Sequence, residues 1–128
     1  MGERIQKSWG WSQEVYRDEL TRVVRIHVEP GGFCSWHKHE RQMNSFAVLS
    51  GELYVETKQG PRPADVRCEY MLPGFVHTVT YGDEHRFRNA NHEPVEALEI
   101  YARGDGDSPP DEFDIVRFSE GGIAKVNA

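Results

Sequence analysis

Short stretches in which apolar and polar residues alternate, each ended by turn residues, follow one another along most of this chain. Within residues 21–28, Val24, Ile26 and Val28 share one face of an extended strand, and His27 falls on the opposite, polar face. We therefore interpret His27 as a solvent-facing residue. Because about nine such stretches follow one another without a helical period, the pattern predicts an all-β barrel or sandwich. The predicted strands cover residues 21–28, 33–39, 44–49, 53–57, 66–72, 75–80, 85–89, 95–102 and 113–118.

The length of 128 residues suits one domain with a single buried core. We expect residues 1–20 to form an N-terminal extension or edge strand, residues 21–118 to form the barrel, and residues 119–128 to be a loose C-terminal tail. Trp9 and Trp11 are two residues apart, so in an extended segment they would share one face. That face would pack either on the barrel or on a partner subunit.

Charge and hydropathy patterning argue against several classes of partner. The formal net charge is −6 and the basic residues are scattered, which is not the electrostatic pattern of a nucleic-acid-binding protein. No apolar run reaches the ~20 residues that span a bilayer, and the N-terminus lacks the apolar core of a secretory signal. We therefore expect a cytoplasmic protein that binds a small molecule, with Cys34 and Cys68 as reduced thiols.

Three histidines are the candidate ligands of a metal ion. His37 and His39 are two residues apart, so their imidazoles point to the same face of a strand. His85 begins a later predicted strand. Three neutral imidazoles brought together on β-structure would hold one divalent transition metal, with Fe, Zn, Mn, Ni and Cu as candidates. Such a site leaves coordination positions open for water and substrate.

The stretch around the first two histidines resembles the first sequence motif of the cupin superfamily. That motif consists of a glycine, a His-x-His pair, a glutamate and a second glycine at fixed spacings. In this chain Asn44 stands at the glutamate position. The residues that match the motif are Gly31, His37, His39 and Gly51.

The third histidine falls in a stretch that resembles the second cupin motif, with Thr80 in place of its proline. A rival alignment puts His77 in the ligand role and leaves Tyr81 at the asparagine position of the motif, so we prefer His85. The two motifs together cover roughly residues 24–103. The residues that match the second motif are Gly74, Gly82, His85 and Asn89.

Within the cupins, the chain is most similar to the sugar-phosphate branch. Residues 7–10, Lys-Ser-Trp-Gly, resemble the opening of the type II mannose-6-phosphate isomerase domain, and residues 114–118, Asp-Ile-Val-Arg-Phe, resemble a segment near its end. The resemblance implies a small jelly-roll barrel (a double-stranded β-helix) with a metal inside, assembled as a homodimer. It also implies a sugar-phosphate isomerase-like activity.

Asn44 and Glu99 are the remaining site candidates. The carbonyl oxygen of Asn44 would be a weak, neutral fourth ligand, so a three-histidine site would keep a net dication and favour an anionic ligand. Glu99 shares one strand face with Tyr101, and if that face lines the barrel, Glu99 would replace the missing ligand or act as a general base. The opposite face, with Leu98 and Ile100, looks like the more natural core.

Three functions fit these residues. The first is a metal-dependent enzyme on a small polar substrate, by resemblance a sugar-phosphate isomerase in which a carboxylate moves the proton. The second is a small dioxygenase, because three histidines around iron or copper leave room for oxygen and a chelating substrate. The third is a non-catalytic cupin that only binds a small molecule. A barrel fold hosts all three, so the fold does not choose among them. Arg41, Arg86 and Arg88 are interpreted as surface residues.

Overall fold

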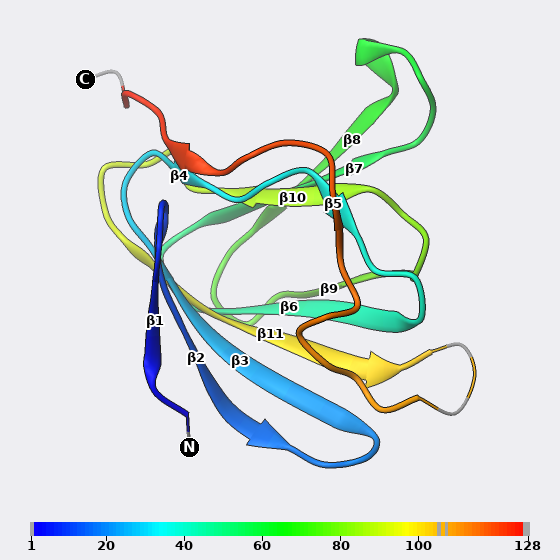
Figure 1. The fold of residues 1–128 in the computed structure, drawn as a ribbon. Coiled ribbons are helices and arrows are strands. Elements are labelled where there is room, and N and C mark those ends of the chain that lie inside the picture. Colours follow the sequence, from blue (N-terminus) through cyan, green and yellow to red (C-terminus); the bar gives the residue numbers. More distant parts are fainter. Residues whose placement is uncertain (1, 105, 107, 127–128) are drawn as a thin grey trace.

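Two antiparallel sheets face each other in the computed structural model, which describes residues 2–104, 106 and 108–126 (Figure 1). The first sheet has the order β1-β2-β3-β11-β6-β9, and the second has the order β12-β5-β10-β4-β13, with β7 pairing with β10 and β8. The first contains β1 (Arg4–Lys7), β2 (Gly10–Arg17), β3 (Thr21–Val28), β6 (Gln42–Ser50), β9 (Val76–Val79) and β11 (Val95–Arg103). The second contains β4 (Gly32–Phe33), β5 (His37–Lys38), β7 (Leu53–Lys58), β8 (Val66–Met71), β10 (His85–Arg88), β12 (Val116–Arg117) and β13 (Gly122–Ile123).

The all-β prediction is therefore confirmed, and most predicted strands are present with small shifts at their ends. A 3-10 turn at Pro63–Asp65 precedes β8. In the described part of the chain, no helix is long and apolar enough to cross a membrane. Gly51 closes the predicted hairpin between β6 and β7 with a φ of 83°, a backbone conformation that favours glycine.

The core lies between the sheets and is filled by alternate residues of the long strands. In β11 the buried set includes Val95, Ala97 and Glu99, whereas Leu98 and Ile100 are only half-buried on the outer face. The expectation that Leu98 and Ile100 would form the core is therefore wrong. The reason is register, because β11 lies between β3 and β6, and its inward residues align with the inward, apolar residues of β3.

The predicted strand at residues 33–39 is divided into β4 and β5. Cys34 and Ser35 are both buried, so the strict alternation of a strand is broken between them. Cys34 still joins the core, and its Sγ accepts a hydrogen bond from the backbone N–H of Phe87. Trp36 instead is half-buried, and the centroid of its ring lies 4.9 Å from the guanidinium carbon of Arg86.

The two N-terminal tryptophans lie on different sides of the barrel, which contradicts the expectation of a shared face. Trp9 is in the turn between β1 and β2 and packs edge-on against Phe87, with ring centroids 4.9 Å apart. Trp11 is in β2 and stacks on His27 of the neighbouring strand. The alternation rule fails here because a turn, rather than an extended strand, carries Trp9.

The end of the chain is more ordered than predicted. β13, within the segment expected to be a loose tail, pairs with β4, and the N–H of Ala124 donates a hydrogen bond to the carbonyl of Gly31. Before it in the sequence, β12 pairs with β5 at the edge of the second sheet (Figure 1). We call residues 111–118 the strap.

Candidate metal centre

The three predicted histidines meet inside the barrel. His37 lies in β5, and His39 is the first residue after that strand. His85 begins β10 and lies directly opposite His37. All three are buried, with exposures of 1–4%, and their ligand nitrogen atoms lie within 4.8 Å of one another. His77, the rival third ligand, lies in β9 opposite Phe46 and is outside this cluster.

Hydrogen bonds to the backbone fix the orientation of each imidazole. The Nδ1–H of His37 donates to the carbonyl of Ser35 at 2.7 Å, and that of His85 donates to the carbonyl of Asp83 at 2.9 Å. Because a carbonyl can only accept, Nδ1 carries the proton and Nε2 keeps its lone pair. A hydrogen-bonded Nδ1–H with an unprotonated Nε2 is the arrangement of most histidine metal ligands.

His39 is oriented in the same way by the strap. Its Nδ1–H donates to the carbonyl of Asp114 at 2.7 Å. The Nε2 atom of His39 is fully buried, and no described residue offers it a hydrogen-bond partner. A buried nitrogen lone pair without a donor is costly, and a bound cation would satisfy it. The residues present therefore fit a metal ion.

Burial keeps all three imidazoles neutral. It lowers the pKa of His37 to about 3, helped by the neighbouring His85 and His39. It lowers the pKa of His85 to about 4, and it lowers the pKa of His39 as well. Neutral imidazoles are the form that binds a metal, so the cluster is ready to ligate without first losing protons at neutral pH.

Asn44 and Glu99 lie beside the histidines on adjacent strands β6 and β11. The Asn44 side-chain Nδ2 donates to Glu99 Oε2 at 3.1 Å and lies 3.5 Å from His85 Nε2. The hydroxyl of Tyr101 donates to the same Glu99 oxygen at 2.7 Å. These two hydrogen bonds to one oxygen fix the orientation of the Glu99 carboxyl group. Asn44 Oδ1 is buried without a partner among the described residues.

The strap holds the loop that carries His39 in place. Besides orienting His39 through its carbonyl, Asp114 accepts hydrogen bonds through its carboxylate from three successive backbone N–H groups, those of residues 40–42. Sequence reasoning did not assign Asp114 to the site. The similarity of residues 114–118 to the sugar-phosphate cupins could have indicated that Asp114 belongs to the site.

A cavity of about 480 Å³ opens beside the histidines. Its wall includes His37, His39, Glu99 and Tyr101, together with Arg22 from β3, which sequence reasoning also missed. This volume falls within the range of small-molecule pockets. One small molecule in this pocket would therefore contact two of the candidate ligand histidines, the carboxyl group of Glu99 and the guanidinium of Arg22.

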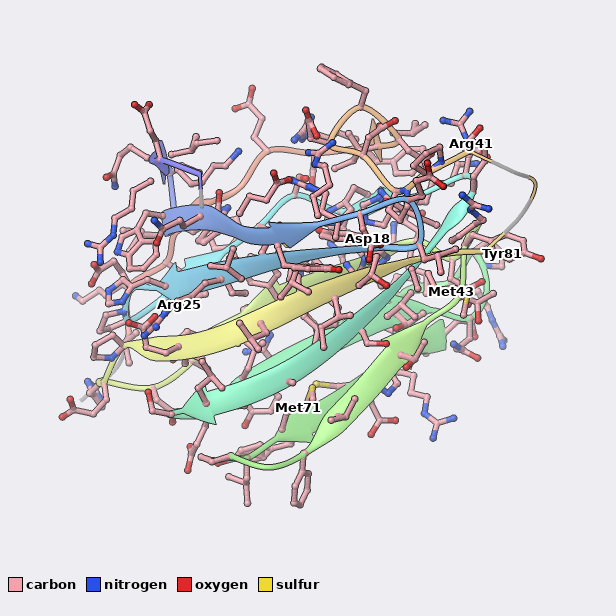
Figure 2. All side chains as sticks on the ribbon, turned by 90° about the horizontal axis from the view of Figure 1, so that it is seen from below. Asp18, Arg25, Arg41, Met43, Met71 and Tyr81 are labelled. Atoms are coloured by element: carbon pink, nitrogen blue, oxygen red, sulfur yellow. The ribbon has the colours of Figure 1, made fainter. Side chains whose placement is uncertain are left out.

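Other candidate residues lie away from this pocket. His27 is on the outer face, within hydrogen-bond distance of Glu29 and near Glu96, as its polar-face position predicted. Arg86 and Arg88 both pair with Glu56 on the outside of the second sheet. Arg41 lies in the loop between β5 and β6 and is exposed (Figure 2).

Two antiparallel sheets closed around converging neutral imidazoles define a β-barrel with a candidate three-histidine metal centre. Residues 24–101 match the family model of the cupin domain. The matched range runs from β3 to β11 and includes all three histidines. The chain belongs to the cupin family.

Comparison with individual proteins adds a distant relative and several similar folds. The chain is 27% identical over 114 residues to the "Putative mannose-1-phosphate guanylyltransferase" of Vibrio cholerae serotype O1, covering 89% of this chain and 22% of that protein. The chain thus spans about a fifth of the length of the curated relative that it matches.

Solved structures with the same fold include oxalate decarboxylase from Bacillus subtilis, with a TM-score of 0.71 at 21% identity, covering 90% of this chain and 29% of that one. An uncharacterised protein with a double-stranded β-helix domain from Klebsiella pneumoniae has a TM-score of 0.65 at 21% identity, covering 93% and 82% of the two chains. At these identities the likeness shows the fold, a double-stranded β-helix, as the sequence motifs implied.

Proposed function

We propose that this protein holds one divalent transition metal through His37, His39 and His85 and uses it to bind a small anionic molecule. The observation that carries the proposal is the convergence of three ligand nitrogens within 4.8 Å, each imidazole oriented by a backbone carbonyl. Fe, Zn, Mn, Ni and Cu all accept such a ligand set. Asn44 is the proposed weak fourth ligand, through its unpartnered Oδ1.

Within that site we propose a sugar-phosphate isomerase-like reaction. A bound metal would act as a Lewis acid on adjacent carbonyl and hydroxyl oxygens. Glu99 would take up and return the proton, because its carboxyl group is held in the wall of the pocket by Asn44 and Tyr101. Support comes from the sugar-phosphate substrate in the name of the Vibrio cholerae relative.

The first experiment is elemental analysis of gently purified protein. We expect stoichiometric metal in the wild type and in His77→Ala, and loss of metal in His85→Ala. His77 is the matched control, because it lies in a nearby strand outside the cluster. Loss of metal in His77→Ala alone, or no metal in any protein after reconstitution, would refute the proposed centre.

The second experiment tests catalysis on the metal-loaded protein. A panel of aldose and ketose phosphates is assayed for interconversion with the wild type and with Glu99→Gln, which keeps the size of the side chain and removes the base. We expect Glu99→Gln to lose roughly 10²–10⁴-fold in kcat while keeping its metal. Equal rates for the two proteins would exclude Glu99 as the base.

A dioxygenase is the second candidate function. Among the described residues, the metal cluster contains three histidines and no carboxylate, which leaves a dication suited to a chelating, anionic substrate. Iron or copper in the purified protein, with oxygen uptake on a diketone, would favour this function over the isomerase. A protein that binds its ligand but converts neither panel would be a non-catalytic binding cupin.

A further inference from the structure

The pocket beside the histidines contains an inward-facing arginine for which the proposed chemistry has no use. Arg22 lies in β3 with the same parity as the buried Val24 and Ile26, and it is directly opposite Tyr101 of β11. Its side chain is 14% exposed and lines the pocket. An arginine turned inward at the end of a strand costs desolvation unless its donors are used.

Contacts on one side of Arg22 hold it while leaving its terminal donors available. Its Nε donates to Glu14 at 2.7 Å, and its guanidinium carbon lies 5.1 Å from the centroid of the Tyr101 ring. Within the described residues, neither terminal amino group hydrogen-bonds to a protein acceptor. The Tyr101 ring in turn packs edge-on against His39, with centroids 5.3 Å apart. The guanidinium is therefore separated from the candidate metal ligands by a single aromatic ring.

A second arginine reaches the same pocket from the opposite sheet. Arg117 lies in β12, directly across from His37 in β5, and lines the pocket. Its positive charge is one of the influences that lower the pKa of His37, which reflects how close the two groups are. Arg117 has no ion-pair partner in the part of the chain that the structure describes. Both arginines thus line one cavity, each from a different sheet.

Most of the carboxylates that line the pocket accept hydrogen bonds from groups other than the terminal amino groups of Arg22 and Arg117. Asp114 accepts from three backbone N–H groups of residues 40–42. The remaining lining carboxylates and their donors are Glu99 with Asn44 and Tyr101, Asp111 with the N–H groups of Phe113 and Asp114, and Glu112 with Arg17. Glu112 also lies 3.9 Å from Arg22 Nε, which leaves the terminal amino groups of Arg22 unengaged by it. Glu120 is the one lining carboxylate for which the described residues provide no such donor.

We infer that the pocket takes a small molecule with a carboxylate or phosphate group at one end, which Arg22 and Arg117 bind, and with metal-binding oxygens at the other end. The planar fork of an arginine fits either anion through two parallel hydrogen bonds. The inference rests on the proposed function, because the metal held by the histidines is the second anchor. It adds the substrate class, a molecule that bridges a metal and an anion site across the barrel.

The test is calorimetric titration of the metal-loaded full chain with mannose 6-phosphate, malonate and uncharged mannose, with metal content measured in each sample. The variants are Arg22→Gln, Arg22→Lys and Arg117→Gln. Arg67→Gln is the matched control, because it removes the same charge from an exposed residue that lines another pocket. The Arg22→Lys variant keeps the charge and removes the fork, which covers the case in which Arg22→Gln does not fold.

We expect at least one of the two anionic probes to bind about tenfold or more tightly than mannose, and to weaken roughly 10–100-fold in Arg22→Gln and Arg117→Gln. Arg67→Gln should match the wild type, and Arg22→Lys should fall between. Metal-loaded protein that binds mannose as tightly as both anions, or arginine variants equal to Arg67→Gln, would overturn the inference and leave the metal centre standing. Arginine-dependent anion binding by protein that takes up no metal would overturn the bridging mode and the proposed centre together.

Discussion

Asn44 occupies the position where the first cupin motif carries its glutamate. The residues around it predict what a negative charge at this position would do to stability and to metal binding. Its Nδ2 lies 3.1 Å from Glu99 Oε2 and it is fully buried. A second carboxylate there would repel Glu99 in the metal-free protein, because like charges at this distance in a buried site are strongly unfavourable. With a dication bound, the same carboxylate would instead be attracted.

We therefore expect Asn44→Asp to shift stability in opposite directions with and without metal. In the chelator-treated protein the melting temperature should fall by roughly 10 °C. With zinc added, affinity should rise by about tenfold or more, because the fourth ligand becomes charged. Thermal melts and zinc titrations measure both effects, with Asn44→Ala as the control that removes the amide without adding charge. A melting temperature that is unchanged without metal would show that the two side chains do not interact.

The site residues differ in how far sequence could predict them. His37, His39 and His85 were predicted because the spacing of two motifs fixes which strands carry them. Glu99 was predicted only conditionally, because its strand offers two faces and the more apolar one, with Leu98, seemed the better core. Hydrophobicity misleads there because the inward face combines the buried apolar residues Val95 and Ala97 with the polar residue Glu99, which lines the pocket. Register with β3, which decides the face, is a tertiary property that one sequence does not display.

The strap is the element that connects the end of the chain to the candidate centre. Asp114 carries most of this connection, through a carbonyl that orients His39 and a carboxylate that accepts from three backbone N–H groups. A carboxylate buried to 7% exposure with three donors is hard to replace. The loop between β5 and β6 should therefore depend on a residue more than 70 positions away.

We expect Asp114→Asn to weaken metal binding without touching a ligand atom. An amide keeps one acceptor oxygen and turns a donor group toward backbone N–H groups, so the loop loses bonds and gains a repulsive contact. Metal affinity should fall about 10–100-fold, as is typical when partners of metal ligands are changed, and the melting temperature should fall as well. Competition with a metal indicator measures the affinity. Glu93→Gln serves as the control, because Glu93 is exposed and lies outside the pocket. Equal affinities in the two variants would contradict a role for the strap.

Elements formed by neighbouring residues were predictable, and elements formed by distant pairing were not. Alternation and turn residues indicated the long strands and the hairpin at Gly51. β13 was missed because its two residues, Gly122 and Ile123, have no strand-like pattern and pair with β4 far earlier in the chain. The division between β4 and β5 was missed for a similar reason, since burial of both Cys34 and Ser35 follows from packing rather than from local periodicity.

At the scale of the whole molecule, the homodimer implied by the sugar-phosphate cupins stays a prediction. Several apolar side chains around the turn before β9 are exposed, including Leu72 at 39%, Phe75 at 53% and Val76 at 65%. Exposed apolar groups of this kind often mark contact surfaces. We expect light scattering to give twice the chain mass of 14.7 kDa. Phe75→Ser should shift that mass toward one chain if this surface is the contact. Phe113→Ser should not, and Phe113 serves as the control because it is an exposed phenylalanine (83%) on the strap.

The stability of the metal-free protein should depend on pH through the three buried histidines. Burial lowers the pKa of His37 to about 3 and of His85 to about 4, and it lowers that of His39, whereas in the unfolded chain these groups titrate near 6.5. Below pH 6.5 the unfolded chain therefore binds more protons than the folded one. Proton binding lowers the free energy of the unfolded chain relative to that of the folded state. The free energy of unfolding is therefore highest above pH 6.5 and declines as the pH decreases toward 4.

Each histidine that titrates in this way contributes up to about 1.4 kcal/mol per pH unit, so the decline between pH 6.5 and 4.5 should be steep. The carboxylates with lowered pKa values, such as Glu14 and Glu112, add their own loss only at lower pH, near and below their ordinary value of 4.5. Urea denaturation of chelator-treated protein at pH 7.5, 6.5, 5.5 and 4.5 separates the two ranges. Replacing His85 by glutamine should flatten the upper range, because one titrating group is removed while the polar side chain remains. A free energy of unfolding that is constant from pH 6.5 to 5 would mean that the folded barrel binds as many protons as the unfolded chain, which would contradict the lowered pKa values of the three imidazoles.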